Sequence, residues 1–207
     1  LPGLTPADTN ETMLRKIGMQ NRMIANLITI DGVLDAASMA KVLGVYRELL
    51  SKLEALPASK VRDELIADVI GALASMASDA KFTVDEATMA QLLAALDRQA
   101  TAGNIVGTME PLAALAKAGH TNALKIIAKH NGISALLAAA AAAESRGDLA
   151  SAAKLRALAM SIMDCVQLNA DSMHSAADLA MLASIYSSLP ETMLLQTLPT
   201  SSELLLN

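Results

Sequence analysis

Aromatic residues are almost absent from this chain of 207 residues, which has two tyrosines, one phenylalanine and no tryptophan. Cysteine is equally scarce, since the sequence contains Cys165 alone. A single cysteine excludes an intrachain disulfide. A lone thiol is typical of proteins in a reducing compartment, so we expect a cytoplasmic, intracellular location. With so few rings, the core has to be built from aliphatic side chains, methionine and alanine.

Clusters of positive charge are also missing, and the net charge of −5 is spread thinly along the chain. Nucleic-acid binding requires a cationic stripe, often with stacking aromatics, and the sequence has neither. The longest uninterrupted apolar run, residues 135–143, is far shorter than the roughly 20 residues that span a bilayer. We therefore expect neither a nucleic-acid partner nor a membrane span.

Motifs for catalysis or metal binding are not found. His120 and His130 do not share a helical turn, and no second metal ligand follows either of them at i+3 or i+4. Cys165 and His174 are the residue types of a nucleophile and a base, but a small buried cysteine inside a helix is the favoured interpretation. The segment 103–107 has two glycines without the lysine of a P-loop. We expect no cofactor, no metal and no enzymatic activity.

What the sequence does contain is helix-forming residues. Apolar residues make up 53% of the chain, which is enough for a sizeable core. Alanine and leucine favour helices, and β-branched runs are scarce, so the prediction is an all-α fold. Start and stop signals predict helices at about residues 8–29, 34–56, 60–78, 83–99, 109–118, 122–129, 133–145, 149–167 and 171–189.

Particular residues are expected to begin these helices. Capping boxes are predicted at Asp8 with Glu11 and at Thr83 with Glu86. Pro111 is expected in the first turn of its helix, where proline is tolerated. Asp171 or Ser172 is expected to cap the last of them.

A unit of about 43 residues recurs, and its best copy covers residues 114–163. In this copy one helix ends at Asn131-Gly132 and an apolar helix starts at once, with Leu136 and Leu137 expected on its buried face. Ala–Leu pairs at residues 72–73, 114–115 and 157–158 fall 42 and 43 residues apart. Repeated helical units that bury one another's faces form a solenoid. The alanines at 138–143 either permit close approach of neighbouring helices or are helical filler.

The residues 132–137, Gly-Ile-Ser-Ala-Leu-Leu, resemble the start of the second helix of an armadillo repeat. Residues 122–129 resemble the first helix of that repeat, and residues 154–163 resemble the third. The chain is therefore similar to the armadillo family with degenerate units, and the related HEAT repeat stays open for the weaker ones. The resemblance implies a right-handed α-solenoid of about four units over residues 9–189. A leader, 1–8, would precede it, and residues 190–207 would be a tail or the start of a further unit.

Armadillo peptide binders carry a tryptophan and an asparagine, four residues apart, on the third helix of each unit. The matching pairs here are Gly71 with Ser75, Ala113 with Lys117, and Arg156 with Met160. None of these residues is tryptophan or asparagine, so the resemblance does not extend to the clamp that holds nuclear localisation signals. On a concave face of third helices, the predicted partner contacts are Ser75, Lys117, Arg156 and Met160.

Three functions follow from these patterns. The leading hypothesis is a non-enzymatic scaffold that binds a protein or peptide partner, as a segment of a larger protein. The alternative is an Ala-rich cytoskeletal bundle of the vinculin or talin kind, although such bundles use helices of 25 to 35 residues. An all-α enzyme would need a polar cluster that the sequence does not reveal. The C-terminal leucines 204–206 also suggest self-association through an apolar tail.

Overall fold

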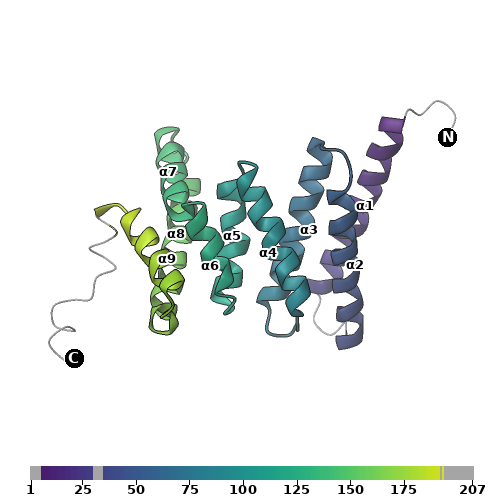
Figure 1. The fold of residues 1–207 in the computed structure, drawn as a ribbon. Coiled ribbons are helices and arrows are strands. Elements are labelled where there is room, and N and C mark those ends of the chain that lie inside the picture. The colour runs from purple at the N-terminus through teal and green to yellow at the C-terminus, as the bar shows by residue number, and fades with distance from the viewer. Residues whose placement is uncertain (1–5, 30–34, 192, 194–207) are drawn as a thin grey trace. The chain divides into compact units, whose positions relative to one another are not determined.

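The computed structural model describes residues 6–29, 35–191 and 193. In this part of the chain the backbone is helical and contains no strand, which confirms the all-α prediction. Its helices are α1 (Pro6–Thr29), α2 (Ala36–Glu54), α3 (Lys60–Ser78), α4 (Glu86–Thr101), α5 (Ile105–Lys117), α6 (Asn122–Lys129), α7 (Gly132–Ser145), α8 (Leu149–Asn169), the 3-10 turn η1 (Ala170–Ser172) and α9 (Ala176–Ser187), drawn in Figure 1. The leucines 204–206 lie outside the described residues.

The helices form two compact units, Leu1–Ala95 and Leu96–Asn207, with the boundary inside α4. In the first unit, α3 packs against both α1 and α2. Ser59 begins α3, because its side chain accepts a hydrogen bond from the backbone N–H of Arg62 at 3.1 Å. Gly18 lets α1 approach α3 closely, since a Cβ at this position would lie 2.8 Å from Leu65. The buried apolar side chains of this unit are aliphatic apart from Met76 and Tyr46, and two polar residues, Asn21 and Thr88, are buried with them.

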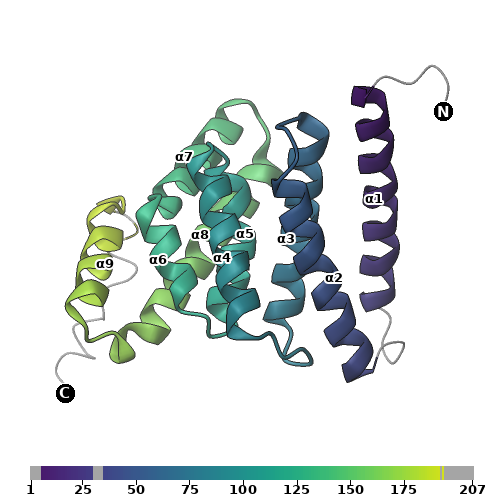
Figure 2. The ribbon, with the colours of Figure 1, turned by 45° about the vertical axis from the view of Figure 1, so that its right-hand side comes forward.

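In the second unit, α7 and α8 pack along each other as a hairpin, and α5 packs against α6, α7 and α8 (Figure 2). Small side chains make this packing close, because Ala140 and Ala143 of α7 and Ala152 and Ala159 of α8 are all buried. Other alanines of the 138–143 run are exposed. The run therefore serves helix packing on one face of α7 and faces solvent on the other.

The junction between α6 and α7 depends on two adjacent residues. Asn131 adopts the left-handed conformation at φ 50°, which asparagine tolerates better than most residues with a side chain. The axes of α6 and α7 consequently meet at 58°. Gly132 is needed for another reason, because a Cβ there would collide with Sδ of the buried Met109 and stand 3.1 Å from Ile127. Here glycine provides space, while asparagine provides the turn.

Several predicted helix starts are corrected by the structure. The helix α5 begins at Ile105 rather than near 109, so Pro111 lies inside it and not in its first turn. The capping residue of α4 is Asp85, which accepts from the N–H of Thr88 at 2.6 Å, and not Thr83. Ser175 caps α9 in the same way, by accepting from the N–H of Asp178 at 3.0 Å.

The remaining predicted caps also lie elsewhere than expected. Asp171 and Ser172 belong to the 3-10 turn η1, so neither caps α9. The helix α1 starts at Pro6, which places Asp8 within the helix rather than before it.

On the apolar face of α7, Leu136 is fully buried as predicted, but Leu137 is only half-buried.

Candidate protein-interaction surface

The four predicted contact residues lie on the helices that sequence reasoning assigned to them. Ser75 is exposed on α3 in the first unit. In the second unit, Lys117 is exposed in the last turn of α5, Arg156 is exposed on α8, and Met160 is half-buried one turn further along α8. All four side chains are therefore at least partly accessible to a partner.

Within the second unit, Lys117 of α5 and Arg156 of α8 have different charged or polarisable neighbours. Arg156 forms an ion pair with Glu144 of α7. Lys117 lies close enough to Cys165 for its charge to act on the cysteine thiol. Since Cys165 follows Arg156 by nine residues, the two positions are about 13 Å apart along the axis and half a turn apart around it.

The solvent-facing side of α8 lies next to Arg156 on the helix. Ala157, Asp164 and Leu168 are exposed on it, at spacings of about one or two helical turns, and Met160 lies among them. Leu168 is 83% exposed, which is unusual for a large apolar side chain. We call this side, with residues 157, 160, 164 and 168, the outer face of α8. It combines small residues, flexible thioether and aliphatic groups, and one carboxylate.

A polar cluster that sequence reasoning missed joins the end of α4 to the end of α6. Nε2 of His130 lies 2.6 Å from Oδ1 of Asp97, and Nζ of Lys129 lies 2.9 Å from Oδ2. The hydrogen bond from His130, together with that from Lys129, holds the pKa of Asp97 below its usual value. No local motif predicts this contact, because 33 residues separate the carboxylate from the imidazole.

Cys165 is buried in α8, as predicted for a structural cysteine. Burial raises the pKa of its thiol, and the nearby Lys117 opposes this effect only in part. The thiolate form that a nucleophile requires is thus disfavoured. Among the described residues, no group of three or more His, Cys, Asp or Glu side chains is placed to hold a metal ion.

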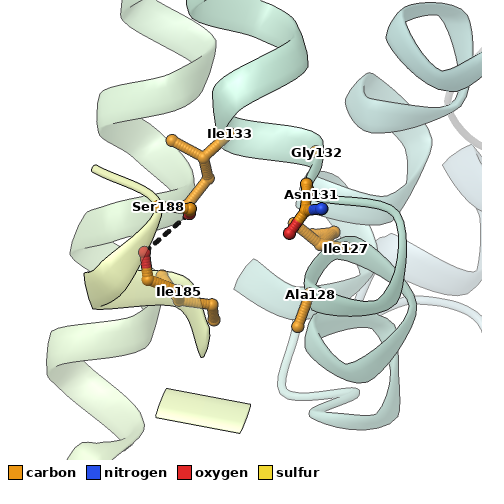
Figure 3. Close-up of a pocket in the computed structure, with 7 residues that line it drawn as sticks. All are labelled: Ile127, Ala128, Asn131, Gly132, Ile133, Ile185 and Ser188. Carbon is orange, nitrogen blue, oxygen red and sulfur yellow. Dashed lines mark hydrogen bonds between the residues drawn. The ribbon is translucent and has the colours of Figure 1, made fainter. Parts of the chain in front are cut away.

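A small cavity lies where α9 meets the junction of α6 and α7 (Figure 3). Its walls are Ile127, Ala128, Asn131, Gly132, Ile133, Ile185 and Ser188. The volume of about 10 Å³ has room for one water at most, so this is a packing gap and not a ligand site. Ser134 of α7 donates to the carbonyl of Ser188 at 3.0 Å and ties the end of α9 to this junction.

Two grooves flank α1 within the first unit. The groove beside α3 measures about 420 Å³, and charged residues of both signs, including Arg22 and Asp68, line it. The groove beside α2 measures about 150 Å³ and contains Asn21. Sequence reasoning missed Asn21, although a signal was present. Asn21 interrupts the apolar face of α1, standing between Ile17 and Ile24 at helical spacing.

Comparison of the chain with family models, with curated proteins and with solved structures yields no match.

Membrane crossing can be judged from the helices themselves. In the part of the chain that the structure describes, no single helix has both the length and the hydropathy to cross a bilayer, and α6 with α7 reaches them only as a pair bent by 58°.

Proposed function

We propose that this protein is a non-enzymatic scaffold that binds a protein or peptide partner through the surface of an armadillo-like or HEAT-like, right-handed α-solenoid. The observation that carries the proposal is the three-helix unit α6–α7–α8. A short helix of 8 residues turns by 58° at Asn131 into a helix of 14 residues, which pairs with a helix of 21 residues. A short helix followed by a packed pair is the expected form of an armadillo unit.

The proposed partner surface comprises Lys117, Arg156 and Met160 on α5 and α8, with Ser75 on α3 as a further contact. The choice is supported by the exposure of Ser75, Lys117 and Arg156 and by the partial exposure of Met160. Arg156 and Met160 stand where the family's peptide clamp would have tryptophan and asparagine, so an extended localisation signal is a poor candidate for the partner. The outer face of α8 suits an apolar partner segment, and acidic residues on that partner would pair with Lys117 and Arg156. We propose an intracellular location, because the single cysteine is a buried free thiol.

The test is the double charge reversal Lys117→Glu with Arg156→Glu. The matched control is Lys125→Glu with Arg146→Glu, which makes the same change of net charge at exposed residues of the same unit. Proteins captured from lysate by the native chain should be lost with the first variant and retained with the control. Equal capture by all three chains would contradict this choice of surface, provided that thermal melts show both variants folded.

The cytoskeletal bundle of the vinculin or talin kind is the competing proposal, supported by the long α1 of 24 residues. Against it, α5, α6, α7 and α9 each have 14 residues or fewer. Small-angle scattering separates the two, because a solenoid gives a more elongated distance distribution than a compact bundle. The self-association predicted for leucines 204–206 stays a prediction, because these residues lie outside the part of the chain that the structure describes.

A further inference from the structure

The dipeptide Asn131-Gly132, which turns α6 into α7, is also a chemically reactive sequence. Asn131 is the one asparagine of the chain that precedes a glycine. At such a pair the backbone nitrogen of the glycine, which no side chain shields, can attack the amide carbon of the asparagine. A bond forms between N of Gly132 and Cγ of Asn131, and the Cγ–Nδ2 bond breaks. The amide nitrogen leaves as ammonia, with the proton that Gly132 gives up. Water then opens the resulting succinimide ring at either carbonyl, which yields aspartate or isoaspartate.

Both reacting groups are available at the junction. The side chain of Asn131 is exposed and makes no capping hydrogen bond. Gly132 is the first residue of α7, so its N–H has no acceptor within the helix. The rate of the reaction therefore depends on how the two groups are oriented.

The folded junction holds the two groups in an unreactive orientation. Asn131 has φ 50° and ψ 45°, and in this left-handed conformation the carbonyl oxygen of a residue lies close to its own Cβ. The nitrogen of Gly132 lies on the other side of that carbonyl carbon, so it points away from the Asn131 side chain. Attack requires this peptide to rotate by about half a turn. The rotation is opposed because the carbonyl of Asn131 accepts from the N–H of Ala135 at 3.0 Å and Gly132 is buried.

The helix α9 covers this junction. Its buried Ile185 lines the same small cavity as Asn131 and Gly132 (Figure 3). The hydrogen bond from Ser134 to Ser188 secures the end of α9 there. We propose that Asn131 is a deamidation site that the folded junction keeps closed, and that departure of α9 opens it. Because isoaspartate lengthens the backbone by one carbon, the turn cannot close again in its original form. The product is then a permanent record of the opening.

Mass spectrometry after incubation at pH 7.4 and 37 °C tests the site, because each conversion adds about one dalton to the tryptic peptide 130–146. Asn131 is the one asparagine in this peptide, and chromatography separates its two products. We expect the rate in guanidinium, where the chain is unfolded, to exceed the rate in buffer at least tenfold. Equal rates would overturn the closed junction, and absence of product from the unfolded chain would overturn the site itself. Asn131→Gly keeps the left-handed turn without an amide, and its peptide should not change in mass.

A pair of variants tests the part played by α9. Ile185→Ala removes a side chain of α9 from the cavity and should speed deamidation in buffer at least threefold. The matched control is Ile162→Ala, which removes an equally buried side chain of α8 that does not line the cavity. Equal or greater acceleration by the control would show that only unfolding of the whole unit exposes Asn131, and would overturn the role of α9. Ser134→Ala removes only the bond to Ser188 and provides a second line if thermal melts show Ile185→Ala unfolded. A folded Ser134→Ala chain that reacts no faster than the native chain would then refute the proposal.

Discussion

The imidazole of His130 donates to the carboxylate of Asp97 across 33 residues of sequence, with 2.6 Å between Nε2 and Oδ1. This bond holds the last turns of α4 to the end of α6, within one compact unit. His130 is mostly buried, and Asp97 is about one-third exposed. A charge-assisted hydrogen bond in such a position stabilises the unit more than an ion pair in open solvent does.

Replacement of Asp97 by Asn should lower the free energy of unfolding by about 1–2 kcal/mol at neutral pH, because the acceptor of the hydrogen bond from His130 loses its negative charge. Because hydrogen bonding from His130 lowers the folded-state pKa of Asp97 below 3.8, its contribution is present above pH 3.8. It is lost as the pH falls through the folded value. Urea melts should therefore show that Asp97→Asn is less stable than the native chain at pH 7, and that this difference in stability disappears at pH 3. Asp164→Asn, at an exposed site on α8, is the control and should show no such difference.

Tyr46 should make stability sensitive to alkali. Burial raises the pKa of Tyr46 from 10.0 to about 12, which means that the fold favours the neutral phenol. That stabilisation is complete below pH 10 and is lost as the pH rises towards 12. Tyr46→Phe should lower the free energy of unfolding by about 1 kcal/mol at pH 8, because it removes the hydrogen bond to the backbone oxygen of Asn21. The variant should not show the additional loss of stability in alkali. Tyr186→Phe, at a half-buried site, provides the comparison in denaturant melts at pH 8 and pH 11.

Substitution of Gly132 by Ala should destabilise the chain by about 1–3 kcal/mol, because the new methyl group collides with the buried Met109. Gly71→Ala is the matched control, since a Cβ at this position in α3 meets nothing within 4 Å. That control should stabilise α3 by roughly 0.5–1 kcal/mol. In a double-mutant cycle, Met109→Ala should reduce the cost of Gly132→Ala. Independent effects of the two substitutions would show that the helix junction adjusts without displacing Met109.

Leu136→Ala should cost about 2–5 kcal/mol, since Leu136 is fully buried within the second unit. Leu137→Ala, one residue along on the same helix, should cost clearly less because its side chain is half-buried. Guanidinium melts of both variants compare the two positions directly. A cost below half a kcal/mol for Leu136→Ala would be inconsistent with its place in the core.

Local signals predicted much of the helical order. The bounds of α3 and α6 agree with the prediction, because a serine cap, Ser59, and the Asn131-Gly132 stop act within a few residues. The start of α5 was missed because Pro111 is an N-terminal signal by propensity, yet packing of Met109 and Leu112 keeps it inside the helix. The start of α9 was missed because three polar residues compete as caps, and only Ser175 precedes the helical backbone.

The residues of the candidate surface were also predicted only in part. The sequence supplied Lys117, Arg156 and Met160 by repeat register, and this register predicts which helix each occupies. It does not predict which neighbour each meets, and so the pairing of Arg156 with Glu144 is visible only in the structure.

The sequence by itself determined that the chain is helical, that its core is mainly aliphatic, and that one helix ends at Asn131-Gly132, because these properties depend on composition and on neighbours along the chain. Only the tertiary structure decided that Asp97 meets His130, that Gly132 makes room for Met109, and that α9 is tied to the junction of α6 and α7. Each of these depends on helices brought together by burial of apolar surface, a non-directional force that no local sequence pattern records.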